Sequence, residues 1–180
     1  MEELEDPTEK LKEINESVEE RVEAKEKWIT LVALSTAIIA VFAAICGLIG
    51  NHHANEAMLL QIKSSDQWNY YQAKGIKYEG VVNTLSLLHA MNKEDTALQS
   101  KMTGLAKDKE KIMKEAQKFQ EDSEQEMRQH LVFAYAITIF QVAIAISAVV
   151  ILTRKKGLWY ACLFLVALGI YFMTKGFLTV

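Results

Sequence analysis

Three uncharged stretches divide the chain into alternating apolar and polar regions. Residues 28–50 and 131–153 each run for 23 positions without a charged side chain, and residues 157–174 run for 18 more. A membrane-spanning helix needs about 20 predominantly apolar residues. The pattern therefore predicts three transmembrane helices, of which the third is the shortest. A buried helix of a soluble protein is the alternative for each stretch, but runs of this length disfavour it.

The polar region 51–130 is predicted to form two helical arms with a reversal at residues 92–95, where polar side chains cluster. In the returning arm a large apolar residue recurs every seven positions, and the same phase continues into the second span. These residues are Leu98, Leu105, Ile112, Phe119, Phe133 and Phe140. The outgoing arm has a weaker repeat, in which Tyr71, Tyr78 and Leu85 share one phase.

A sustained seven-residue repeat is typical of coiled-coil-like packing. Region 51–130 is therefore predicted to be a long extramembrane antiparallel helical hairpin. A bend at Gly75 and Gly80, which would fold the outgoing arm back, is the alternative.

Region 1–27 has the pattern of an acidic amphipathic helix. Asp6-Pro7-Thr8-Glu9 provides an N-cap acid, a proline at the first helical position and a glutamate at N3. Apolar residues then recur at steps of three and four, at Leu11, Ile14, Val18 and Val22. This stripe predicts docking on a partner helix, such as a second copy, because an acidic helix is repelled by anionic lipid. A partly frayed helix leading into the membrane is the alternative.

Composition supports long helices. The 180 residues include one proline and eight glycines, and these are the residues that most often interrupt a helix. The predicted fold class is therefore an all-α integral membrane protein, with three transmembrane helices and the hairpin between the first and the second. The first span is predicted to be an anchor, because a cleaved signal peptide has a basic start and a shorter apolar run.

The charge distribution predicts an orientation. Region 1–27 carries −6, region 51–130 carries −1, and the basic turn 154–156 (Arg-Lys-Lys) carries +3. Basic residues in short loops stay on the inner side of a membrane. The N-terminus and the basic turn are therefore predicted to lie inside, with the hairpin and the tail 175–180 outside. The inverse orientation is the alternative.

Small residues in the first span suggest a helix-packing face. Ala33, Ala37, Ala40, Ala44 and Gly47 follow a four–three–four–three spacing, which lets helix backbones approach closely. The face is predicted to meet either the second span or another subunit.

Gln141 lies near the middle of the second span. It is predicted to hydrogen-bond between helices, and a pore-lining position is the alternative.

Histidines and carboxylates gather at the predicted outer membrane boundary. His52, His53 and Glu56 follow the first span, and Glu126 and His130 precede the second. An antiparallel hairpin would bring the two groups to the same depth. Imidazoles with carboxylates are able to bind zinc or another transition metal, or to respond to pH between about 5 and 8. The alternative is that they mark the water boundary and hydrogen-bond across the hairpin.

The sequence lacks the motifs of common enzyme classes. It contains no nucleophile elbow, Walker loop, dinucleotide fingerprint or CxxC pair. We therefore expect a non-enzymatic protein without a cofactor. The nearly balanced charge of region 51–130 predicts no nucleic-acid binding, and the absence of ionisable residues inside the spans disfavours a pump.

The residues 51–57, 61–63 and 65–77 read NHHANEA, QIK and SDQWNYYQAKGIK. In these motifs, and in Lys27-Trp28-Ile29 at the first span, the chain resembles a family of uncharacterised bacterial membrane proteins, domain of unknown function 4337. The resemblance covers most of the chain. It implies a protein of the bacterial inner membrane and no known activity. Together with the orientation predicted from the charges, this places the hairpin in the periplasm and the N-terminus in the cytoplasm as an expectation.

The same motif directs attention to a group of aromatic and charged residues in the outgoing arm: Asp66, Trp68, Tyr71, Lys74 and Lys77. Trp and Tyr beside charges are typical of protein-binding hot spots. The alternative is that they join the two arms of the hairpin.

The expected function is that of a membrane interaction or scaffold protein, which self-associates or binds another membrane protein through the hairpin and the small-residue face. A metal- or pH-responsive sensor using the boundary histidines is the second hypothesis. An oligomeric pore lined by the second span around Gln141 is the third.

Overall fold

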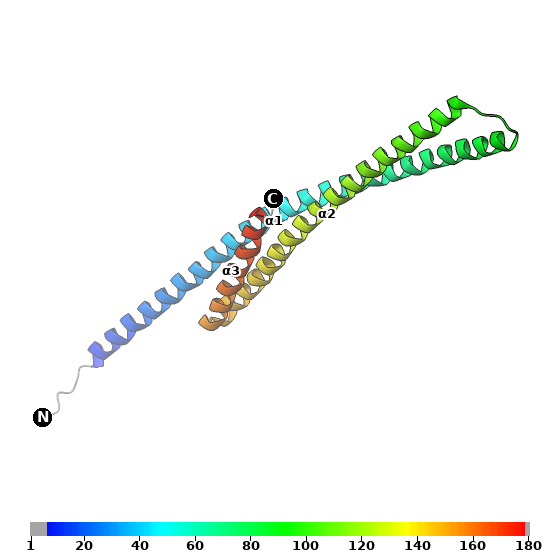
Figure 1. The fold of residues 1–180 in the computed structure, drawn as a ribbon. Coiled ribbons are helices and arrows are strands. Elements are labelled where there is room, and N and C mark those ends of the chain that lie inside the picture. The colour runs from blue at the N-terminus through cyan, green and yellow to red at the C-terminus, as the bar shows by residue number, and fades with distance from the viewer. Residues whose placement is uncertain (1–6, 179–180) are drawn as a thin grey trace. The chain divides into compact units, whose positions relative to one another are not determined.

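The computed structural model describes residues 7–178, which form three helices and no strand. Helix α1 is Pro7–Ala90, α2 is Thr96–Thr153 and α3 is Lys156–Leu178 (Figure 1). The prediction of an all-helical chain is confirmed for these residues. Each of the three helices contains a segment long and apolar enough to cross a membrane.

Helix α1 begins at Pro7, where the fixed backbone angle of proline suits a first helical residue. The predicted cap at Asp6 lies outside the described residues. From there α1 is continuous through Gly75 and Gly80.

The predicted reversal at residues 92–95 coincides with the loop between α1 and α2. Asn92 has a φ of 55°, the left-handed conformation that commonly ends a helix. The N–H groups of Asn92 and Lys93 donate to the carbonyls of His89 and Leu88 over 3.0 and 2.9 Å, so the last carbonyls of α1 are satisfied. Helix α2 then starts with an Asp95 cap, whose carboxylate accepts from Leu98 N–H at 3.0 Å.

The described chain divides into two compact units. Unit 1 contains residues 7–48 and 132–178, and unit 2 contains residues 49–131. Helices α1 and α2 contribute residues to both units.

Unit 2 is an antiparallel pair formed by the second half of α1 and the first part of α2. The Ser64 hydroxyl donates to the Ala116 carbonyl at 3.0 Å, and the Ser123 hydroxyl donates to the Ala57 carbonyl at 2.8 Å. A serine side chain is short, so it reaches a facing backbone only where two helices lie close together. The two backbones are therefore close together at these small residues.

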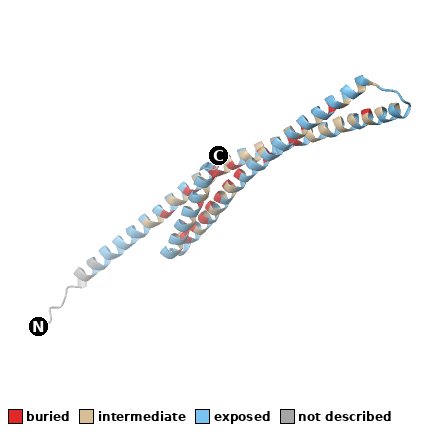
Figure 2. Cartoon of the chain, viewed as in Figure 1, coloured by how far each residue is buried: buried red, intermediate tan, exposed pale blue. Residues whose placement is uncertain are grey.

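The seven-residue phase predicted for the returning arm is on the buried side of α2. Leu105 and Ile112 are buried, Leu98 and Phe119 are half-buried, and both aromatic residues of the phase inside the second span are fully buried. Figure 2 shows how narrow the buried strips are along each helix.

Unit 1 packs α3 against α2 by inserting aromatic rings over glycines. A Cβ atom added to Gly169 would lie 2.5 Å from Cε1 of Phe140, and one added to Gly176 would lie 2.8 Å from Cζ of Phe133. One further repeat along, the Ser147 hydroxyl lies 3.1 Å from the Cys162 sulfur. The contacts recur every seven residues on both helices, so the register of this antiparallel pair is fixed by small residues on α3.

The first part of α1 packs in unit 1 through large side chains. Val32, Ile39 and Cys46 are buried, and the ring of Phe42 stacks on that of Phe140 with centroids 6.2 Å apart. The stripe predicted on the N-terminal part of α1 is exposed, with Leu11 61% accessible (Figure 2).

Candidate functional site

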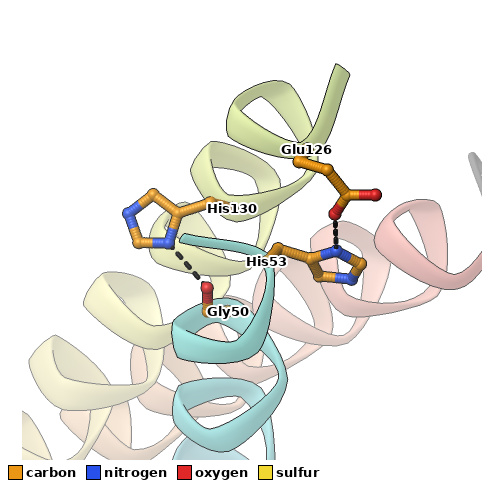
Figure 3. A network of polar contacts seen from close by, with 4 residues as sticks. All are labelled: Gly50, His53, Glu126 and His130. Carbon is orange, nitrogen blue, oxygen red and sulfur yellow. Dashed lines mark hydrogen bonds and ion pairs between the residues drawn. The ribbon is translucent and has the colours of Figure 1, made fainter. Parts of the chain in front are cut away.

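A histidine–carboxylate pair occupies the buried side of the helix pair in unit 2. His53 Nδ1 lies 2.6 Å from Glu126 Oε2, and the two side chains are 14% and 27% exposed (Figure 3). Glu126 stands in the seven-residue phase of α2, between Phe119 and Phe133, where a large apolar residue would continue the pattern. The pair therefore substitutes a polar contact for one layer of apolar packing.

His130 makes a second, separate contact across the helix pair. Its Nδ1 lies 2.9 Å from the carbonyl oxygen of Gly50 (Figure 3). A carbonyl only accepts, so Nδ1 of His130 carries the proton in this bond.

The predicted boundary residues are thus brought together in part. His53, Glu126 and His130 all bond across the helix pair, as the alternative interpretation expected, whereas His52 is exposed and Glu56 is half-buried. Among the side chains that the structure describes, no three from His, Cys, Asp or Glu converge as a group able to hold a metal ion.

We expect Glu126→Leu and His53→Leu each to destabilise unit 2 by about 1 kcal/mol, because each removes one partner of a charge-assisted hydrogen bond that is largely shielded from water. The double variant is expected to be close to the wild type, since an apolar pair of suitable size often replaces an ion pair without loss. Hydrogen exchange of the amides in region 51–130 measures the stability of unit 2 in the single variants and in the double variant. Additive losses in the double variant would show that the two side chains do not act as a pair.

The aromatic and charged motif of the outgoing arm is partly used inside unit 2. Lys74 Nζ lies 2.7 Å from Asp108 Oδ2, and Lys109 Nζ lies 5.0 Å from the ring centroid of Tyr71. Trp68 packs edge-on against Tyr71 with centroids 5.6 Å apart. The contacts of Lys74 and Tyr71 with α2 join the two arms, as the alternative interpretation expected, whereas the contact of Trp68 is within α1.

Two members of the motif point elsewhere. Asp66 and Lys77 are both exposed on α1. They are the part of the motif that remains accessible on the surface of unit 2.

The contact with Asp108 raises the pKa of the Lys74 ammonium, chiefly through the hydrogen bond. A raised pKa in the folded state means that the stabilisation is fully present at neutral pH and is lost only as the pH rises through that pKa. The Lys74 ammonium is therefore charged throughout the physiological range.

The small-residue face of the first span is not used inside unit 1. Its four alanines are exposed and Gly47 is half-buried, whereas the neighbouring face with Val32, Ile39 and Cys46 is buried. The exposed alanines are Ala33, Ala37, Ala40 and Ala44. The prediction left open whether this face meets the second span or another subunit, and within the described chain it does not meet the second span. Gln141 is exposed as well.

Sequence reasoning missed the small residues that set the helix contacts. In unit 2 these are Gly50, Ala57 and Ser64 on α1, spaced by seven, and in unit 1 they are Gly169 and Gly176 on α3. The regular spacing of small residues was the available signal, whereas the seven-residue repeat that predicted the hairpin consists of large apolar side chains.

A comparison with protein families places the chain. The model of a family described as Domain of unknown function (DUF4337) matches residues 28–179. The chain belongs to this family. The DUF4337 match includes all of unit 2 and the described part of α3, whereas the stripe from Leu11 to Val22 lies before it.

Searches of curated proteins and of solved structures found no match to this DUF4337 chain. Its function is therefore argued from its own residues.

Proposed function

We propose that the chain is a non-enzymatic scaffold protein of the bacterial inner membrane, which self-associates through the small-residue face of α1. The observation that supports this is the exposure of Ala33, Ala37, Ala40 and Ala44, beside a face of the same helix that is already packed. Small residues permit close contact between membrane helices, and such contact is a main source of their association. A second copy of the chain supplies an identical face.

Gln141 supports the same proposal. Its amide is exposed in the middle of the second uncharged stretch, where hydrocarbon would offer it no hydrogen-bond partner. A helix of another subunit provides one, and an interhelical bond of this kind contributes about 0.6–2 kcal/mol.

The proposed orientation has the N-terminus and the basic turn in the cytoplasm and unit 2 in the periplasm as an extramembrane hairpin. Arg154 and Lys155 between α2 and α3 support it through the positive-inside rule. In this arrangement the exposed stripe of Leu11, Ile14 and Val18 is a second contact for a partner helix on the cytoplasmic side.

A pH-responsive role for unit 2 is the second candidate. It is favoured by the contact between His53 and Glu126 on the buried side of the helix pair. Imidazole is the side chain that changes charge between about pH 5 and 8. Its test is hydrogen exchange at pH 5.5 and pH 8, corrected for the intrinsic exchange rate of amides at each pH, in the wild type and in the double leucine variant. The protection of the amides in region 51–130 is expected to change with pH more in the wild type than in the variant, which keeps the contact of His130 with Gly50.

We expect the double variant Ala37→Leu/Ala40→Leu to weaken self-association at least about tenfold, equivalent to about 1.4 kcal/mol, because the larger side chains keep the helix backbones apart. Energy transfer between labelled copies in proteoliposomes, measured while lipid is added to dilute the protein, gives the association constant.

The matched control is Ala161→Leu/Ala167→Leu, which makes the same change at two exposed alanines of α3. It is expected to associate like the wild type. Equal weakening by both double variants, or a wild type that remains monomeric at every dilution, would contradict the proposal.

A further inference from the structure

Unit 1 contains a pocket of about 540 Å³ lined by four cationic side chains. Arg21 and Lys25 come from α1, Arg154 comes from the connection between α2 and α3, and Lys156 is the first residue of α3. Trp28 and Ile29 form part of the wall, and no acidic residue lines it.

The arrangement concentrates positive charge. Arg21 and Lys25 are four residues apart on one helix, a spacing at which like charges repel. None of the four cations forms an ion pair with another side chain in the described part of the chain, although the neighbouring Lys27 pairs with Glu23 at 3.0 Å. The pocket therefore favours an anion as its counter-charge.

The backbone at Arg154 provides an independent observation. Arg154 has a φ of 54°, a left-handed conformation at the end of a helix that glycine or asparagine adopts with less strain. Its N–H donates to the Val150 carbonyl at 2.8 Å, which holds it there. The arginine therefore stands at a position where the backbone conformation by itself favours glycine or asparagine.

The pocket lies where apolar and polar parts of the chain meet. Trp28 and Ile29 begin the uncharged stretch 28–50, and Lys156 directly precedes the stretch 157–174. In a membrane this is the level of the lipid headgroups, where tryptophan is enriched and where basic pockets between helices bind anionic lipid.

We propose that this pocket binds the phosphate of an anionic phospholipid headgroup. The guanidinium groups of Arg21 and Arg154 match phosphate oxygens in a fork geometry, and the two ammonium groups add point charges. Trp28 and Ile29 contact the apolar part of the lipid next to the headgroup. The inference rests on the proposed membrane location and goes beyond the proposed self-association, since it concerns a different face of unit 1.

The test is native mass spectrometry of the full chain in mild detergent, titrated with phosphatidylglycerol or with phosphatidylcholine of the same acyl chains. The wild type is expected to retain phosphatidylglycerol at least about tenfold more tightly. Arg21→Gln/Lys156→Gln is expected to lose this preference. Lys27→Gln/Lys155→Gln removes the same charge from residues outside the pocket lining and is expected to keep it.

Three results would overturn the assignment. Equal loss of the phosphatidylglycerol preference in both variants would mean that the overall positive charge of the region, and not the pocket, attracts the lipid. Equal retention of the two lipids by the wild type would mean that the protein does not distinguish the headgroup charge. Displacement of the lipid by millimolar inorganic phosphate would identify a soluble phosphate as the ligand.

Extraction of cell membranes with alkaline carbonate separates this inference from the membrane proposal. A chain released into the soluble fraction would contradict both. A chain that stays in the membrane but fails the lipid titration would contradict the pocket assignment alone.

Discussion

Gly169→Ala is expected to loosen α3 from α2 and to destabilise unit 1 by about 2–3 kcal/mol, the cost of over-packing a well-filled interior. The added Cβ would lie 2.5 Å from Cε1 and 2.8 Å from Cδ1 of Phe140. That ring is fully buried and also stacks on Phe42, so it has no free space into which to move.

The thiol of Cys162 reports this change directly, because it is buried on α3 next to Ser147. In a Cys46→Ala background we expect a maleimide to label Cys162 about 30- to 150-fold faster in Gly169→Ala, as the open state becomes more populated. Gly157→Ala makes the same change in α3 with no atom within 4 Å of the added Cβ, and it is expected to leave the rate unchanged. A rate that is unchanged in Gly169→Ala would contradict the observed packing.

Ala57→Leu is expected to separate the two helices of unit 2 and to cost about 3 kcal/mol or more. Ala57 is 1% exposed, and its carbonyl accepts the Ser123 hydroxyl at 2.8 Å. A leucine at this point must force the backbones apart, which adds over-packing strain and leaves a buried hydroxyl without its acceptor.

Hydrogen exchange of amides near Ala57 and Ser123 measures this opening, and 3 kcal/mol corresponds to an increase of about 150-fold. Ala73→Leu introduces the same side chain at an exposed position of α1 and is expected to leave exchange unchanged. Similar exchange in the two variants would show that the close approach of the helices at Ala57 does not stabilise unit 2.

The features that the sequence predicted correctly depend on strong local or periodic patterns. The helix break at residues 92–95 follows from polar residues and an asparagine able to adopt positive φ. The buried side of α2 follows from the seven-residue spacing of large apolar residues such as Ile112 and Phe140. Residues with this spacing lie on one face of a helix, so they identify the face that is buried.

The packing of the first span was not predictable in the same way. All faces of a membrane helix are apolar, so hydrophobicity does not identify the face that packs against its neighbours. The spacing of Ala33, Ala37 and Ala40 singled out one face, whereas unit 1 uses the neighbouring face with Ile39 and Cys46. The fit of the Phe42 side chain against α2 determines which face of the first span packs, and this fit depends on the shapes of both helices.

Sites formed by residues far apart in the sequence were also not predictable from the spacing of apolar and polar residues. The basic turn was interpreted only as a marker of orientation, and its meeting with Arg21 and Lys25 in one pocket depends on how α1 packs in unit 1. Glu126 was assigned to the membrane boundary by its position. Its position in the seven-residue phase of α2 indicates that its side chain faces α1, where it contacts His53.

Self-association through the small-residue face of α1 is tested most directly by cysteine cross-linking in native membranes. A full chain with Ala40→Cys, in a Cys46→Ala/Cys162→Ala background, is oxidised and separated on a denaturing gel. A disulfide requires Cα atoms about 4.4–6.8 Å apart, a distance reached only when two such faces are in contact. We predict a covalent dimer for Ala40→Cys and none for Ala167→Cys at an exposed position of α3. The absence of a dimer at Ala40→Cys, or equal dimer at both positions, would contradict it.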